Sequence, residues 1–307
     1  MSSDELPGWL TEWCSEELGA KPDDVLFRAH SISMVFGLRL TDGTDVVVKA
    51  RPDDGRAESC VAAQARLAER GFPCARPLTR VAAVGSLAVH AEESRPGGEM
   101  LHGDSPEVAV RYAEVFAGVM AALADVVVAP PLPNPRWVRW DHRDPGLWPS
   151  LDFLDERNQD VVPALVVDTA VRARGRLTAA GAPPCVLGHG DFEGQNLRWC
   201  DGAVSTVHDW DSLAWQPEAA LVGAASGMFS GTGPPTLAPI ASSEAFLVAY
   251  QDFRGRRFTA AEQEVAWAAS LWPAAHNARW EALHGDAPLC GDQLRAQAAE
   301  RLRRANA

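Results

Sequence analysis

Acidic and amide side chains gather between residues 187 and 211, in a stretch that otherwise consists of two short apolar runs. It reads LGHGDFEGQNLRWCDGAVSTVHDWD, with Asp191 after the first run, Asn196 five residues later and Asp209 after the second run. Burying such groups is costly unless they are paired, hydrogen-bonded or bound to a metal. If the ends of the two predicted strands meet, these three side chains share one pocket.

The three side chains have the chemistry that phosphoryl transfer needs. Asn and Asp oxygens suit Mg²⁺ when substrate phosphates also hold the metal, and a neighbouring carboxylate can accept a proton from an attacking hydroxyl. Kinase-type enzymes divide the work in this way between one base, one Asn and one Asp. A helix cap for Asp191, a turn for Asn196 and a strand end for Asp209 are the structural alternatives, but the joint pattern favours a site.

The pattern HGDxxxxN followed by hxxxHDWD resembles the catalytic and metal-binding loops of the aminoglycoside phosphotransferase family, distant relatives of the protein kinases. The resemblance implies that Asp191 is the catalytic base and that Asn196 and Asp209 hold Mg²⁺, with Asp209 at the position of the kinase D-F-G aspartate. It also implies that His189 supports the loop by hydrogen bonding. The chain departs from the family's common pattern at FEGQ (192–195), where His-Pro is usual, and the departure leaves these roles intact.

The same resemblance implies a bilobal, protein-kinase-like α+β fold. A small antiparallel-sheet lobe is expected over residues 1–93, and a larger helical lobe over residues 94–307. The order of elements agrees, because helical patterns at 5–19 and 56–70 and strand patterns at 25–29, 34–40, 45–50 and 77–93 come first, with a hairpin turn at Asp42-Gly43. Helical patterns dominate the remainder, at 105–125, 160–180 and 266–286, and the Pro- and Trp-rich segment 129–150 is expected to be a long loop.

A kinase-like fold needs a Lys on its third strand to contact the nucleotide phosphates. Lys49 follows three Val residues on the third predicted strand, and the chain contains one other Lys, near the terminus. A surface Lys on an edge strand is the alternative, but the match with the family position favours the functional one. Glu58, in the first turn of the helix predicted at 56–70, is the expected partner of Lys49, and Glu69 is the poorer alternative.

Two further segments are expected to contact the nucleotide. Ser31 and Ser33 lie in the loop between the first two strands and are expected to contact phosphates. Glu92, Glu93 and Ser94 lie at the predicted hinge, where backbone groups would meet the nucleobase. Because backbone recognition leaves no side-chain pattern, ATP and GTP are both possible donors.

The acceptor leaves weaker signals in the sequence. Aromatic side chains with acidic neighbours could stack on a sugar or hold an amine, although Trp at helical spacing is more often part of a core. The candidates are Asp211, Trp272, His276, Asn277, Arg279, Trp280 and Glu281.

The composition limits the partners. The net charge of −13 argues against general binding of nucleic acid, whose phosphates attract basic surfaces, and it is compatible with a cationic small substrate. The sequence contains no apolar run long enough to span a bilayer, and the first twenty residues do not resemble a signal peptide. Six scattered Cys indicate reduced thiols in a cytoplasmic protein rather than a disulfide framework or a zinc site. The protein is expected to be a monomer or a dimer.

The sequence therefore predicts a kinase that transfers the γ-phosphate of ATP or GTP, with Mg²⁺, to a hydroxyl of a small molecule. An antibiotic is the favoured acceptor (an aminoglycoside, a nucleoside or another sugar-bearing compound), with resistance as the outcome. Metabolic kinases of choline, homoserine or sugars share the pattern. A metal-dependent phosphohydrolase, with His189, Asp191, His208 and Asp209 as ligands, leaves Asn196 and Lys49 without a role. A binding protein without activity would not need the retained polar residues.

Overall fold

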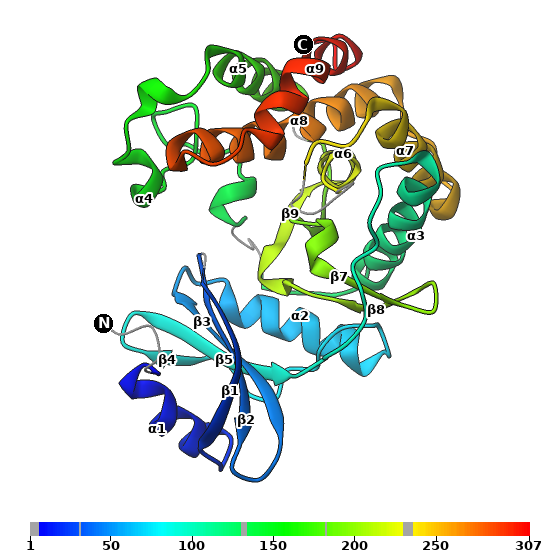
Figure 1. Cartoon of the computed structure of the whole chain (residues 1–307). Coiled ribbons are helices and arrows are strands. Elements are labelled where there is room, and N and C mark those ends of the chain that lie inside the picture. Colours follow the sequence, from blue (N-terminus) through cyan, green and yellow to red (C-terminus); the bar gives the residue numbers. More distant parts are fainter. Residues whose placement is uncertain (1–5, 31, 130–133, 182, 230–235) are drawn as a thin grey trace. The chain divides into compact units, whose positions relative to one another are not determined.

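The computed structural model describes residues 6–30, 32–129, 134–181, 183–229 and 236–307. The chain divides into two compact units, each shown with its elements in Figure 1. The first, here called the sheet unit, comprises Met1–Gly98, Val127–Pro130 and Ser205–Asp211. The second, here called the helical unit, comprises Glu99–Val126, Pro131–Val204 and Ser212–Ala307. A small antiparallel sheet followed by a mainly helical remainder confirms the predicted α+β class.

One five-stranded antiparallel sheet organises the sheet unit, with its strands in the spatial order β1-β2-β3-β5-β4. The strands are β1 (Pro22–His30), β2 (Met34–Leu40), β3 (Asp45–Pro52), β4 (Ala82–Val84) and β5 (Leu87–Glu93). Each overlaps a predicted strand. Asp42-Gly43 makes the turn between β2 and β3, where Gly43 has a φ of +86° and its N–H donates to the carbonyl of Leu40 at 2.9 Å.

Side chains alternate along β3, so the sheet has one apolar face and one polar face. A buried apolar cluster joins helix α1 (Gly8–Glu17) to alternate sheet residues, among them Val46, Val48, Ala50, Val89 and Ala91. Lys49 and Arg51 therefore point to the other face, and the register places His90 of β5 opposite Lys49. Helix α2 (Ala57–Glu69) lies on this polar face, where its Gln64 side chain hydrogen-bonds with β5.

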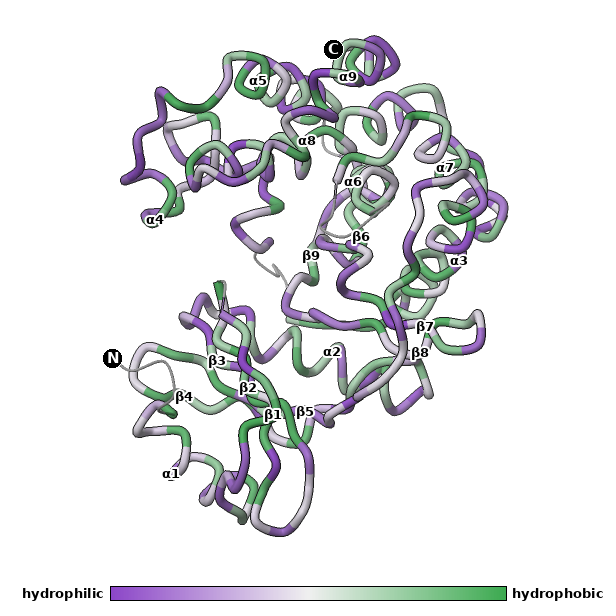
Figure 2. The backbone as a smooth tube through the Cα atoms, in the orientation of Figure 1, coloured by the Kyte–Doolittle hydropathy of each residue, from purple (hydrophilic) through white to green (hydrophobic). Residues whose placement is uncertain are grey.

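The helical unit contains most of the helices of the described residues. They are α3 (Pro106–Leu123), α4 (Asp152–Asp155), α5 (Ala164–Ala179), α6 (Glu218–Gly227), α7 (Ile240–Arg254), α8 (Ala260–His284) and α9 (Leu289–Arg304). Thr259 and Glu262 form a capping box at the start of α8, and Gly285 ends α8 in the left-handed conformation. In Figure 2, α9 is mostly purple, as expected for a helix rich in Arg and Gln.

Helices α6 and α8 pack against each other through a glycine. A Cβ atom placed on Gly223 of α6 would lie 2.1 Å from the carbonyl oxygen of Ala266 in α8. No side chain fits at that distance, so the close approach of the two backbones depends on Gly223. Since α6 follows directly after β9, this packing fixes the end of a strand that supports the candidate site.

Two short sheets carry the acidic stretch at 187–211. Strand β6 (Cys185–His189) pairs antiparallel with β9 (Leu213–Pro217), and β7 (Leu197–Cys200) pairs with β8 (Ala203–Val207). The prediction of strands before Asp191 and before Asp209 is confirmed. Their partners β7 and β9 were not predicted, because each is a run of four or five residues with little alternation.

The described part of the Pro- and Trp-rich segment has few regular elements, as predicted. Hydrogen bonds from arginine side chains hold it at several points. Arg174 of α5 donates hydrogen bonds to four carbonyls of this segment, those of Trp140, His142, Gly146 and Leu147. Arg136 donates to the carbonyl of Ser150 at 2.6 Å. The half-buried Arg174 guanidinium therefore holds together a loop that has little regular secondary structure of its own.

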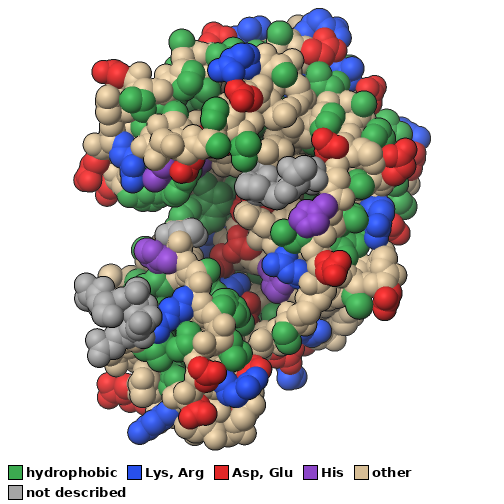
Figure 3. Space-filling view, in the orientation of Figure 1, with side chains coloured by type: hydrophobic (Ala, Val, Ile, Leu, Met, Phe, Trp, Pro, Cys, Tyr) green, Lys and Arg blue, Asp and Glu red, His purple; other side chains and the backbone are tan. Residues whose placement is uncertain are grey.

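Basic and acidic side chains are interspersed over the visible face of the helical unit (Figure 3), in line with surface ion pairs such as Arg303 with Glu300 and Arg304 with Glu244. Among the helices of the described residues, none is both long and apolar enough to cross a membrane.

Candidate functional site

Lys49 forms a buried ion pair with Glu92 on the polar face of the sheet. Its Nζ lies 3.1 Å from Glu92 Oε1, and Gln64 Nε2 of α2 donates to Glu92 Oε2 at 2.8 Å. Burial by itself would lower the pKa of Lys49, but the carboxylates of Glu92, Asp211 and Asp209 raise it above its ordinary value. Lys49 is therefore a fixed positive charge, held in place by one carboxylate.

The expected pairing of Lys49 with Glu58 is wrong. Glu58 is exposed on α2, whereas the carboxylate beside Lys49 comes from β5. Glu69, the alternative, lies 3.6 Å from Arg66 in an exposed pair. The physical reason is the register of the sheet, because Lys49 is opposite His90 and Glu92 lies one step along the same face.

The same register changes the role expected for the hinge residues. Glu92 contributes its side chain to Lys49, and the backbone N–H of Glu93 already donates to the carbonyl of Arg76 at 2.9 Å. The Glu93 side chain accepts from Arg76 at 2.8 Å. Ser94 and Ser33 are half-buried, and Ser31 lies outside the described residues.

Arg51, two residues after Lys49 on the same face, forms a second buried ion pair, with Asp211. Both residues are buried, and each is 5% exposed. Burial alone would raise the pKa of Asp211, but the charges of Arg51 and Lys49 hold it far below its usual range. Asp211 is thus ionised and already paired with the Arg51 guanidinium. This pairing does not fit its expected role as a substrate contact.

His90 completes the polar face. Its Nε2 lies 3.9 Å from Glu92 Oε2, and burial lowers the pKa of the imidazole to about 4. His90 is therefore neutral at pH 7, so it adds no third cation beside Lys49 and Arg51.

The loop that carries Asp209 is held on both sides. Before it, the Val207 N–H donates to the Pro73 carbonyl at 2.7 Å, and after it the Trp210 indole N–H donates to the Val207 carbonyl at 2.9 Å. Trp210 is buried, with its ring edge-on to Phe72. Asp209 itself has a φ of +61°, which a non-glycine residue seldom adopts. The surrounding contacts therefore impose the conformation of the Asp209 backbone.

The loop that carries Asp191 lies in the helical unit and is closed by its own side chains. The Asp191 N–H donates to His189 Nδ1 at 3.3 Å, and Asn196 Nδ2 donates to the Asp191 carbonyl at 2.9 Å. The Gly190 N–H donates to the Ser212 carbonyl at 2.7 Å, which continues the β6–β9 pairing. His189 thus contacts this loop through a hydrogen bond, and the side chain of Asp191 is half-buried.

The first two residues of the FEGQ segment, Phe192 and Glu193, are buried. Phe192 is buried, with its ring centroid 4.8 Å from that of Phe116 and 6.5 Å from that of Tyr112. Glu193 is also buried and accepts from Gln195 Nε2 at 2.7 Å. This departure from the family pattern therefore anchors the loop in the aromatic core of the helical unit.

Asn196 and Asp209 have the donor atoms that a hard cation requires. The amide nitrogen of Asn196 is used by the Asp191 carbonyl, which leaves its amide oxygen as the atom that can bind a metal. The described residues contain no group of three or more His, Cys, Asp and Glu side chains arranged to hold a metal ion. Taken separately, the amide oxygen of Asn196 and the carboxylate of Asp209 are oxygen ligands of the kind that Mg²⁺ takes in proteins.

The acceptor candidates of α8 fall into two groups. Trp272, His276 and Arg279 are buried, and Arg279 donates to Asp155 Oδ1 at 2.7 Å. Burial lowers the pKa of His276 to about 4. These three side chains match the alternative in which Trp at helical spacing belongs to the core.

The other three candidates of α8 are half-buried. Trp280 stacks on His284 with ring centroids 4.2 Å apart. Glu281 accepts the backbone N–H groups of Cys290 and Gly291 at 2.7 and 3.1 Å, so it caps the start of α9. Asn277 is the remaining member of this group.

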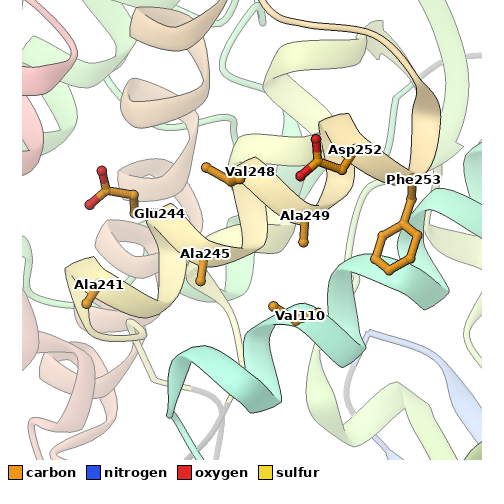
Figure 4. Close-up of a pocket in the computed structure, with 8 residues that line it drawn as sticks. All are labelled: Val110, Ala241, Glu244, Ala245, Val248, Ala249, Asp252 and Phe253. Carbon is orange, nitrogen blue, oxygen red and sulfur yellow. The ribbon is translucent and has the colours of Figure 1, made fainter.

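A pocket of about 570 Å³ lies between α3 and α7, and Figure 4 shows the side chains that line it. Its lining includes the apolar side chains of Val110, Val248 and Phe253 and the carboxylates of Glu244 and Asp252. None of the candidate residues from the sequence lines this pocket.

The sequence did not reveal Arg51, His90 and Gln64 as members of this cluster. It predicted a backbone contact to the nucleobase for Glu92, whose side chain instead pairs with Lys49. Part of the signal is in the sequence, because alternation along β3 places Lys49 and Arg51 on one face. The register between β3 and β5 adds His90 and Glu92 to that face. The register between the two strands could not be read from the sequence alone.

The sequence profile of the phosphotransferase enzyme family matches residues 34–239 of the chain. No curated protein sequence matches the chain at a significant level.

Solved structures of small-molecule kinases share the fold across nearly the whole chain. An amicoumacin kinase bound to AMP-PNP and Ca²⁺ is 12% identical, with a TM-score of 0.64 over 93% of this chain and 89% of its own. A microcompartment-associated aminopropanol kinase is 14% identical, with a TM-score of 0.62 over 92% and 91%. A spectinomycin phosphotransferase bound to ADP and spectinomycin is 10% identical, with a TM-score of 0.59 over 99% and 94%. These likenesses confirm the predicted kinase-like fold.

Proposed function

Because the chain belongs to the phosphotransferase enzyme family, we propose that it transfers the γ-phosphate of ATP or GTP to a hydroxyl group of a small molecule. The observation that carries the proposal is the buried Lys49–Glu92 pair, which shares its face of the sheet with the anchored Asp209 loop. A Lys charge fixed by a carboxylate is the arrangement that kinases use to hold nucleotide phosphates.

Four residues carry the proposed reaction. Lys49 binds the phosphates of the donor, and Asp209 and Asn196 supply oxygen ligands for Mg²⁺. Bound Mg²⁺ would neutralise charge on the phosphates during transfer. Asp191 orients the acceptor hydroxyl and accepts its proton as the oxygen attacks the γ-phosphorus. His189 and Asn196 support this role, because both hold the backbone of Asp191.

For the acceptor, a hydroxylated antibiotic is the leading candidate, with resistance as the consequence. The structural neighbours include a kinase of amicoumacin and a phosphotransferase of spectinomycin. A metabolic acceptor is the second candidate, since an aminopropanol kinase has the same fold. Asn277 and Trp280 are the α8 residues proposed to contact the acceptor, because they are not fully buried. Six free thiols agree with a cytoplasmic setting.

Nucleotide binding is the first test. Thermal unfolding is measured with ATP or GTP, each with Mg²⁺ and with EDTA. A rise in the unfolding temperature with either Mg-nucleotide supports the proposal, and the absence of any rise with both would exclude a kinase. A panel of hydroxylated antibiotics and small amino alcohols, assayed for consumption of the bound nucleotide, then identifies the acceptor class. Release of phosphate from a monoester without nucleotide would instead support a phosphohydrolase.

A further inference from the structure

The buried pair of Arg51 and Asp211 has no catalytic task in the proposed reaction, yet it lies two residues from each of two proposed site residues. Arg51 follows Lys49 on β3, and Asp211 follows Asp209 in its loop. The described part of the chain gives the Arg51 guanidinium this one charged partner.

Such a pair adds little net stability. Removing two charges from water costs about as much as their mutual attraction returns, and replacing a buried pair with apolar side chains is often neutral or stabilising. The pair does, however, fix geometry, because a carboxylate held by a guanidinium has few alternative positions.

The geometry that it fixes is that of the Asp209 loop. Arg51 holds the side chain of Asp211, and Arg56 of the sheet unit donates from Nη2 to the Asp211 carbonyl at 2.8 Å. The other end of the loop is held through Val207 and Trp210. Between these anchors, Asp209 adopts a φ of +61°, a left-handed conformation that a non-glycine residue seldom adopts. A loop without its anchors would relax out of this conformation.

We propose that Arg51 is a positioning residue that acts through Asp211 to hold the Asp209 carboxylate in the orientation that binds the metal of the donor nucleotide. The inference rests on the proposed function, since it assumes that Asp209 is a metal ligand. It assigns to the third strand two separate tasks: Lys49 binds phosphate directly, and Arg51 sets the metal-binding loop.

The test uses the double variant R51M/D211L, in which both charges are replaced by apolar side chains of similar size. Thermal shift with ATP is measured across a Mg²⁺ titration and in EDTA. We expect the Mg²⁺ concentration for half-maximal stabilisation to rise about tenfold or more, as is usual when the support of a metal ligand is removed. ATP binding in EDTA should change less than about twofold, because Lys49 and Glu92 are intact. The matched control is R39M/D45L, which removes the exposed pair of Arg39 and Asp45 from the same sheet.

A folded R51M/D211L protein with an unchanged Mg²⁺ dependence would overturn the positioning role and leave the kinase proposal standing. A wild-type protein that binds ATP equally with Mg²⁺ and with EDTA would overturn the metal assignment on which the inference rests. If the double variant fails to fold, R51K replaces it, with amide hydrogen exchange of residues 208–212 as an added measurement. Faster exchange together with a raised Mg²⁺ requirement supports the role, and unchanged values for both overturn it.

Discussion

Lys49 and Glu92 lie on adjacent antiparallel strands of one sheet, with 3.1 Å between Nζ and Oε1, and both are buried. Replacing Glu92 with Gln leaves the Lys49 charge without its partner. Breaking a buried pair from one side typically costs about 3–5 kcal/mol, so E92Q should lower the free energy of unfolding by an amount of that order, measured with urea. It should also abolish the thermal shift by Mg-ATP.

The matched control is E58Q, which changes the exposed carboxylate of α2 that the sequence had favoured. We expect E58Q to behave like the wild type in both measurements. An E58Q protein that loses the nucleotide shift while E92Q keeps it would show that the sheet pair is not the functional one.

Asp191 should be needed for transfer and not for nucleotide binding. Loss of a general base typically costs about 10²–10⁴-fold in rate, so D191N should lose activity on that scale and keep the Mg-ATP thermal shift. Asp168, exposed on α5 and paired with Arg172, provides the control D168N, which should retain full activity. Phosphotransfer by D191N at the rate of D168N would remove Asp191 from the mechanism.

Asp209 has a positive φ, and its carboxylate is the proposed metal ligand. Different substitutions test the backbone conformation and the charge separately. Asn tolerates a positive φ, so D209N should be nearly as stable as the wild type and should lose the Mg²⁺-dependent part of ATP binding. D209A should be less stable than D209G by about 1 kcal/mol, because Ala resists the left-handed conformation. Asp201 has a φ of 49°, so D201N is a control with the same backbone conformation that should leave Mg²⁺ dependence unchanged.

His90 and His276 make the fold sensitive to acid. Burial lowers the pKa of each to about 4, below the ordinary 6.5. Between these values the unfolded chain binds protons that the folded chain does not, so stability falls as the pH falls. From pH 7 to pH 5 each His should cost about 2 kcal/mol. Urea unfolding of H90Q should show a smaller loss over this interval, whereas H102Q, at an exposed His, should show the wild-type loss.

Two helical glycines should respond to Ala in opposite directions. Gly223 lies against the backbone of α8, so G223A should lower the free energy of unfolding by about 3 kcal/mol through overpacking. Gly118 of α3 has no atom within 4 Å of its added Cβ, so G118A should raise it by about 0.5–1 kcal/mol. Equal effects of the two changes would contradict the close α6–α8 packing.

The sequence predicted the elements and the acidic loops, and it could not predict the pairings that join them. Strand patterns and the Asp42-Gly43 turn identified the sheet, because alternation and turn chemistry are local properties. The partner of Lys49 depends on which residue of β5 faces it, and that register arises from the packing of both faces of the sheet. The pairing of β6 with β9 likewise joins residues that are far apart in the sequence, and no local pattern encodes it.

The position of Glu92 also bears on regulation. In protein kinases the carboxylate that pairs with the strand lysine belongs to a helix, and movement of that helix controls activity. Here both charges belong to hydrogen-bonded strands, and α2 contributes only the neutral amide of Gln64. A displacement of α2 would remove one hydrogen bond and leave the ion pair in place. The position of the Lys49 charge therefore depends on the pairing of β3 with β5 and not on the position of α2.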